Sequence, residues 1–373
     1  MNKSTKQKFM FIAVVGLLAI IVASGCKRLP FGQKSTSPHS TSTTTLTLTD
    51  ALGREVTFQK APQKIVLVGK ALFTIANAMY LFPEAPERIF AMGDLGQISK
   101  AEFYALVDPK YKEKVKLETE VNAEQVAALQ PDVVLMKSYL AESLGKPIEQ
   151  LGIPVVYMDL ESPDKYSKDI HNLGVLLNDT KHAKKINRFY NNKLELVQNQ
   201  VKNVQNKPTA LVLYYNDKDG NIAFNVPPLN WIQTVMIENA AAVPVWKDAN
   251  LGKGWTKVSF EQIAAWNPDF IFVVAYFNDI DKVLEQLKAD TRWQALSAYK
   301  AGHLYGFPID FVSWDQADTR WILGQLWVAK TIHPDMFKDV DLANAVIEFY
   351  GLYGFNEETV KTKVIPMIKG SFQ

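Results

Sequence analysis

The sequence predicts an α/β protein with two Rossmann-like lobes, which contain parallel sheets, are joined by a single long rigid helix and enclose a ligand cleft. Three observations support this prediction. Short apolar runs alternate with helical patterns in both halves of the chain, one 16-residue segment occurs twice, and a helical stretch without Pro or Gly separates the halves. With 47% hydrophobic and 21% charged residues, the 373-residue chain can bury a large core, which excludes a disordered or fibrous class.

The first residues precede the folded body. Lys3, Lys6 and Lys8 come before an uncharged apolar run at 9–23, which is shorter than the ~20 residues that span a bilayer. Small residues follow and end in Cys26, the single cysteine of the chain. We expect residues 1–25 to be a secretory signal. The segment resembles a bacterial lipoprotein signal, which implies cleavage before Cys26 and lipidation of that residue.

The next segment, 26–45, predicts a flexible tether. Nine of the eleven residues at 35–45 are Ser or Thr, too polar to pack in a core. The folded body is therefore expected to begin at residue 46, outside the cytoplasm and attached to the membrane, on the periplasmic side or at the cell surface, through lipid.

The body divides into three predicted parts. The first lobe covers 46–180, the linking helix 181–205 and the second lobe 206–373. Apolar, β-branched runs indicate buried parallel strands. In the first lobe these runs are 64–68, 88–92, 132–136 and 154–158. In the second lobe they are 209–215, 269–275 and 303–307, with helices expected at 280–288 and 316–332.

An internal repeat indicates that the lobes share one plan. VNAEQVAALQPDVVLM at 121–136 and VSFEQIAAWNPDFIFV at 258–273 are identical at seven of sixteen positions without a gap. Each segment predicts a capped helix, a Pro break and a strand. The repeat places Glu124 and Glu261 at equivalent sites in the first helical turn. A carboxylate there complements the helix dipole, and two matched carboxylates also suit a two-fold partner with paired arginines.

A family resemblance rests on these segments taken in order. TDALGREVTF at 49–58, PQKIV at 62–66, PERIF at 86–90, the repeat, the linking helix and KAGHLYGFP at 300–308 resemble the substrate-binding proteins of ABC importers for iron chelates and vitamin B12. The resemblance implies that Glu124 and Glu261 dock onto a dimeric permease driven by its ATPase, and that the ligand lies between the lobes.

The residues expected to contact that ligand follow the carboxyl ends of the predicted strands, where ligands bind in open α/β sheets. Lys70 and Lys137 can neutralise anionic groups, and aromatic side chains can pack on a chelate. A structural role in packing or capping is the alternative for each. The full set of candidates is Lys70, Lys137, Tyr139, Tyr215, Trp231, Tyr276, Trp314 and Arg320.

The sequence gives little support for a nucleic-acid-binding protein or an enzyme. The net charge of +2 does not indicate a nucleic-acid partner, and the chain contains no GxSxG, HExxH or CxxC motif. We expect no enzyme activity, no cofactor, no bare-metal site and a monomer.

The predicted function is the capture of a metal complex, with a siderophore-type iron(III) chelate as the leading ligand. Corrinoid, haem and molybdate or tungstate stay open as ligands, and a ligand sensor for a signalling partner stays open as a role.

Overall fold

The computed structural model describes residues 45–95, 101–118, 120–249 and 252–372. The secretory signal, Cys26 and almost all of the tether lie outside these residues. The described residues belong to one compact unit that covers 43–373. No helix among them is both long enough and apolar enough to cross a membrane.

The N-terminal lobe is built on a parallel five-stranded sheet with the order β5-β4-β3-β6-β7. These strands are β3 (Ile65–Leu67), β4 (Ile89–Met92), β5 (Val115–Lys116), β6 (Val133–Lys137) and β7 (Val155–Met158). The four predicted strands of this lobe are therefore confirmed within one or two residues. Alternate side chains of β3 enter two different apolar clusters, so both faces of the sheet are covered.

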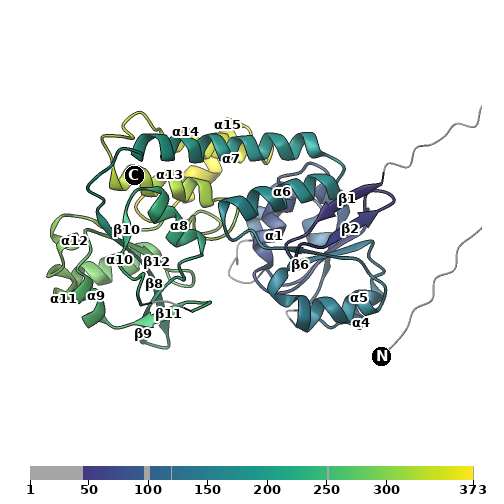
Figure 1. The fold of residues 1–373 in the computed structure, drawn as a ribbon, viewed down its shortest axis with the longest axis horizontal. Coiled ribbons are helices and arrows are strands. Elements are labelled where there is room, and N and C mark those ends of the chain that lie inside the picture. The colour runs from purple at the N-terminus through teal and green to yellow at the C-terminus, as the bar shows by residue number, and fades with distance from the viewer. Residues whose placement is uncertain (1–44, 96–100, 119, 250–251, 373) are drawn as a thin grey trace, which may run out of the picture. The chain divides into compact units, whose positions relative to one another are not determined.

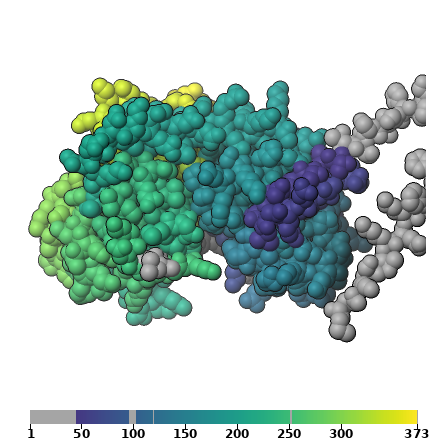
Figure 2. Space-filling model, viewed as in Figure 1, coloured from purple at the N-terminus to yellow at the C-terminus, as the bar shows by residue number. Residues whose placement is uncertain are grey.

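Helices cover both faces of this sheet (Figure 1). They are α1 (Leu72–Met79), α2 (Ala85–Arg88), α3 (Ala101–Val107), α4 (Ala123–Ala128), α5 (Lys146–Gln150) and α6 (Pro163–Leu176). Short 3-10 or π segments occur at η1 (Tyr111–Glu113), η2 (Ser138–Leu140) and η3 (Ala141–Gly145). The hairpin of β1 (Leu46–Thr49) and β2 (Glu55–Phe58) lies on the surface of the lobe, as the purple atoms of Figure 2 show.

The C-terminal lobe contains a sheet of six described strands, which has the predicted parallel pairs and in addition an antiparallel edge that we did not predict. Its parallel part joins β8 (Thr209–Lys218), β10 (Val243–Pro244), β12 (Phe270–Val274) and β13 (Leu304–Gly306). Its antiparallel part adds β9 (Asn221–Val226) beside β8 and β11 (Thr256–Val258) beside β9. The antiparallel edge arises because β8 turns back on itself at Asp219 and Gly220, which both have positive φ.

The helices of the C-terminal lobe confirm the predicted helix at 280–288 and shorten the other one. They are α8 (Ile232–Asn239), α9 (Phe260–Trp266), α10 (Ile280–Ala289), α11 (Thr291–Gln294), α12 (Ser297–Lys300), α13 (Trp321–Ile332), α14 (Leu342–Gly351) and α15 (Glu357–Thr359), followed by η4 (Val360–Val364) and η5 (Ile365–Met367). Helix α13 begins at Trp321 rather than at 316. The Asp318 carboxylate accepts the backbone N–H of Arg320 and holds the preceding segment in a turn.

Helix α7 (Thr180–Val201) connects the two sheets and runs across both lobes (Figure 1). Its start and end lie within a few residues of the predicted linking helix. The Asp179 side chain caps the helix by accepting the N–H of His182. Ile186, Tyr190 and Val197 form part of its buried face. The lobe boundaries at 46–180 and 206–373 stay predictions, because the described residues form a single compact unit.

A buried group of polar side chains links the lobes. Asn77 on α1 donates to Asp318 at 2.5 Å and accepts from Tyr104 on α3 at 2.7 Å. Arg320 forms ion pairs with Asp310 at 2.7 Å and with Asp318 at 2.9 Å, and all three side chains are 0% exposed. We call this set the cross-lobe network; it consists of Asn77, Tyr104, Asp310, Asp318, Thr319, Arg320, Tyr350 and Tyr353.

Candidate ligand-binding cavity

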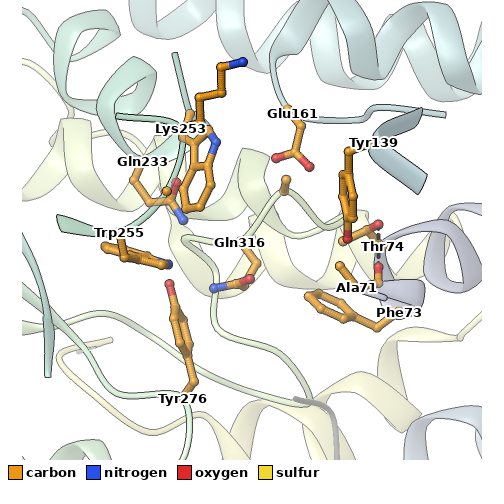
Figure 3. A pocket seen from close by; sticks show the side chains of 13 residues that line it. Ala71, Phe73, Thr74, Tyr139, Glu161, Gln233, Lys253, Trp255, Tyr276 and Gln316 are labelled. Carbon is orange, nitrogen blue, oxygen red and sulfur yellow. Dashed lines mark hydrogen bonds between the residues drawn. The ribbon is translucent and has the colours of Figure 1, made fainter. Parts of the chain in front are cut away.

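A cavity of about 620 Å³ lies between side chains of the two lobes (Figure 3). The N-terminal lobe supplies Ala71, Phe73, Thr74, Tyr139 and Glu161. The C-terminal lobe supplies Trp231, Gln233, Lys253, Gly254, Trp255, Tyr276, Gln316 and Ala317. Apart from Lys253, Gly254 and Trp255, which precede β11, these residues come from segments that follow strands or start helices. This is where the order of the strands in an open α/β sheet places a ligand.

The N-terminal wall is formed around the ends of β3 and β6. Ala71 has φ 50 and starts α1, which brings Phe73 and Thr74 to the cavity. The Thr74 hydroxyl donates to the Ala71 carbonyl at 2.9 Å. Tyr139 stands 57% exposed on the segment after β6. Burial of its hydroxyl, followed by the nearby Glu161 charge, raises the pKa of Tyr139.

Glu161 brings a carboxylate to this wall, and Lys137 neutralises it. Lys137 is only 1% exposed, and its Nζ lies 2.5 Å from the Glu161 carboxylate. The same Nζ also donates to the Asp159 carbonyl. The Lys137 ammonium is therefore held below the wall rather than presented to a ligand.

The C-terminal wall is aromatic. The Trp231 and Trp255 rings meet edge to face at 5.7 Å between centroids, and the Trp255 and Tyr276 rings meet in the same way at 6.1 Å. Tyr214 supports both Trp255 and Tyr276 from behind, at 5.1 and 4.7 Å. Ring faces of this kind offer a large contact area to the apolar surface of an organic ligand.

One buried carboxylate organises the polar groups of this wall. Asp315 is 0% exposed, and its Oδ2 accepts the Tyr276 hydroxyl at 2.5 Å and the Gln233 Nε2 at 3.1 Å. Its Oδ1 accepts the Ser313 hydroxyl at 2.5 Å, and Gln316 Nε2 lies 3.5 Å from Oδ2. Burial raises the pKa of Asp315, while the hydrogen bonds from Ser313, Tyr276 and Gln233 oppose that rise. Burial and the nearby Asp315 charge raise the pKa of Tyr276 well above its ordinary value, so this hydroxyl keeps its proton.

The cavity brings together three of the eight predicted ligand contacts, Tyr139, Trp231 and Tyr276. Lys70 is exposed beside Ala71 but does not line the cavity. The structure places the other four in the interior, where each has a structural partner. Tyr215 donates to Gln286 and Trp314 donates to Asp310, while Lys137 pairs with Glu161 and Arg320 belongs to the cross-lobe network. For these four residues the geometry favours the structural alternative.

Sequence reasoning missed several lining residues. Phe73 and Thr74 lie at the start of a helix that follows a predicted strand, and this position was a usable signal. Lys253 and Trp255 precede β11, which we did not predict. Gln233 is 4% exposed, and its Oε1 is buried without a hydrogen-bond partner in the described structure.

The two predicted docking residues lie apart from the cavity. Glu124 is exposed in the first turn of α4, and Glu261 is exposed in the first turn of α9. Both helices have the predicted capping box, with Asn122 and Gln125 in one and Ser259 and Gln262 in the other. Figure 1 shows α4 in the N-terminal lobe and α9 in the C-terminal lobe.

Comparison with known proteins identifies the class. Residues 95–310, more than half of the chain, match the family described as Periplasmic binding protein, and the chain belongs to this family. It is therefore a substrate-binding protein of the kind that serves an ABC importer, outside the cytoplasm, and the family is one of transport proteins rather than enzymes.

Similar proteins differ in the ligand that their names state, and some names state none. An ABC transporter substrate-binding lipoprotein of Bacillus subtilis, YvrC, is 28% identical over 87% of this chain and 96% of its own length. The molybdate-binding protein MolA of Haemophilus influenzae is 27% identical over 62% of this chain and 69% of its own length. A probable siderophore-binding lipoprotein of Bacillus subtilis, YfiY, is 22% identical over 83% and 93%.

The fold is shared with solved structures. A periplasmic solute-binding protein from Veillonella parvula superposes with a TM-score of 0.70 at 24% identity, covering 87% of this chain and 98% of that chain. This similarity supports the two-lobed architecture.

Proposed function

We propose that the protein captures a siderophore-type iron(III) chelate in the cavity and delivers it to a membrane permease. One observation carries this proposal: a cavity of about 620 Å³ walled by Phe73, Tyr139, Trp231, Trp255 and Tyr276. A volume of this order suits an organic ligand of drug size, and aromatic walls suit the apolar surface of a chelator.

A bare oxyanion fits this lining less well. Tetrahedral oxyanions are bound by several charge-assisted donors, such as clustered Arg and Lys. Among the described residues that line the cavity, Lys253 is the single cation, and it is exposed on the segment before β11. Lys137, a buried cation, is paired with Glu161 of the N-terminal wall. The molybdate named for one relative is therefore the second choice of ligand.

Tryptophan fluorescence of the full-length protein in detergent tests the ligand class. Trp231 and Trp255 line the cavity, so a bound ferric siderophore is expected to quench them saturably at sub-micromolar concentration, whereas the iron-free chelator is not. The double variant Trp231→Phe/Trp255→Phe is expected to lose most of the response. The matched control Trp266→Phe, at the end of α9 and outside the cavity, is expected to keep it. Saturation by molybdate alone would contradict the proposal.

We propose further that Glu124 and Glu261 dock onto a dimeric permease, that the chain acts as a monomer, and that lipid on Cys26 holds it at the membrane. The two glutamates occupy equivalent, exposed positions in the two lobes, as binding to a two-fold partner requires. The double charge reversal Glu124→Lys/Glu261→Lys is expected to abolish uptake by cells and to leave ligand affinity unchanged. The control Glu195→Lys, on an exposed site of α7, is expected to support normal uptake. Normal uptake by the double variant would contradict the docking proposal.

A further inference from the structure

The C-terminal wall of the cavity hides a negative charge without a cationic partner. Asp315 is fully buried, and its side-chain hydrogen-bond donors are all neutral: Ser313, Tyr276, Gln233 and Gln316. Within the described parts of the chain it forms no ion pair with Lys or Arg. Burial raises the pKa of Asp315, but the hydrogen bonds from Ser313, Tyr276 and Gln233 stabilise its ionised form. In the interior such a charge is screened far less than one at the surface.

Because Asp315 accepts the donors of neighbouring side chains, mainly their acceptor atoms are available to a ligand. Tyr276 and Gln233 turn their donors toward Asp315, and Gln316 directs its amide N–H groups the same way. Their oxygen atoms are the polar groups left over, and the Gln233 Oε1 is a buried acceptor without a partner. A donor from a ligand would remove the cost of that unsatisfied acceptor.

The positive charges near the cavity act more weakly on a ligand than the buried Asp315 carboxylate. Lys253 is exposed on a long stem, where water screens it. The starts of α1 and α8 reach the cavity without side-chain caps, and each contributes about half an elementary charge at most. Glu161 and Lys137 cancel one another.

From this geometry we infer that Asp315 acts as a positioning residue that makes the cavity selective for metal chelates of zero or positive net charge that carry N–H or O–H donors. Polyanionic catecholates and oxyanions are disfavoured by the same group. The inference rests on the proposed function and narrows its ligand to a class such as ferric trihydroxamates.

The test compares two probes on the full-length protein in detergent. Ferrioxamine B carries one positive charge and amide N–H groups, whereas ferric enterobactin carries three negative charges. Wild-type protein is expected to bind ferrioxamine B more tightly. Asp315→Asn removes the charge and replaces an acceptor by a donor, so it is expected to shift the ratio of the two affinities at least about tenfold toward ferric enterobactin.

Two further variants separate selectivity from folding. Gln316→Lys places a cation beside Asp315 and is expected to shift the ratio in the same direction, even if Asp315→Asn does not fold. Ser313→Ala removes a donor on the far oxygen and keeps the charge, so the ratio is expected to stay near the wild-type value. Because both affinities come from one preparation, a loss of folded protein cancels from their ratio.

The outcomes distinguish the two proposals. If ferrioxamine B binds more tightly and the ratio shifts in Asp315→Asn or Gln316→Lys, the inference is supported. If a ferric chelate binds but ferric enterobactin is preferred, or if neither variant that folds moves the ratio, the inference is overturned and the proposed function stands. If neither chelate binds while molybdate does, the proposed function fails together with the inference.

Discussion

Replacement of Arg320 by Met tests whether this residue holds the lobes together rather than touching the ligand. Its guanidinium pairs with Asp310 at 2.7 Å and Asp318 at 2.9 Å, and it lies 4.6 Å from the centre of the Phe103 ring, all without exposure to solvent. Arg320→Met removes the cation from two buried ion pairs. Breaking a buried ion pair by removing one partner costs about 3–5 kcal/mol.

Thermal unfolding followed by circular dichroism measures this loss. In a folded body of this size the melting temperature falls by about 1.5 °C per kcal/mol, so a fall of about 4–7 °C is expected. The control is Arg292→Met, which breaks a pair with Asp290 in which the arginine side chain is 64% exposed. Such surface pairs contribute at most about 1 kcal/mol, so the control is expected to melt within about 2 °C of wild type.

A melting temperature for Arg320→Met within about 2 °C of wild type would refute the reasoning. A second readout addresses the ligand directly. At a temperature where Arg320→Met is folded, ligand affinity is expected to match wild type, because Arg320 does not line the cavity.

Four other substitutions have expected outcomes in stability. Burial raises the pKa of Asp169 to about 6, so its ionisation costs the folded state more than the unfolded state as the pH rises from 4 to 7. In urea unfolding, the stability of Asp169→Asn relative to wild type is therefore expected to rise by up to about 3 kcal/mol over that interval, and a constant difference would contradict this. Gly324→Ala would place a Cβ 2.3 Å from the Trp314 carbonyl and is expected to lose about 1–3 kcal/mol, whereas Gly351→Ala, with open space around it, is expected to gain up to about 1 kcal/mol. Ser259→Ala removes the cap of α9 and is expected to lower the free energy of unfolding by about 1 kcal/mol; an unchanged value would show that the cap contributes nothing.

The buried strands were predictable because their apolar runs need no knowledge of the partner strand. The capping boxes were equally predictable, because Asn122 with Gln125 and Ser259 with Gln262 act within one helical turn. The antiparallel edge of the C-terminal sheet was missed, although Asp219–Gly220 is a typical hairpin signal.

The cavity was harder to predict because a position after a strand does not tell which way a side chain points. Tyr276 and Trp314 both follow strands and both are aromatic. Tyr276 lines the cavity, while Trp314 is 0% exposed and donates to Asp310. The Asp315 carboxylate escaped prediction for a related reason, since its donors Gln233 and Tyr276 are distant in sequence and meet only in the fold.

The cross-lobe network restricts the number of ways in which the lobes can move. Two bodies joined only by one helix could bend and twist about it in several directions. Here Asn77 also donates to Asp318, and Tyr353 donates to the Asn77 carbonyl, so side chains form a second attachment in addition to the backbone of α7. Two separate attachments leave mainly one rotation, about the line that joins them. Opening of the cavity then has a single coordinate, and one distance across its mouth, such as that between probes at Tyr139 and Lys253, would follow the whole movement.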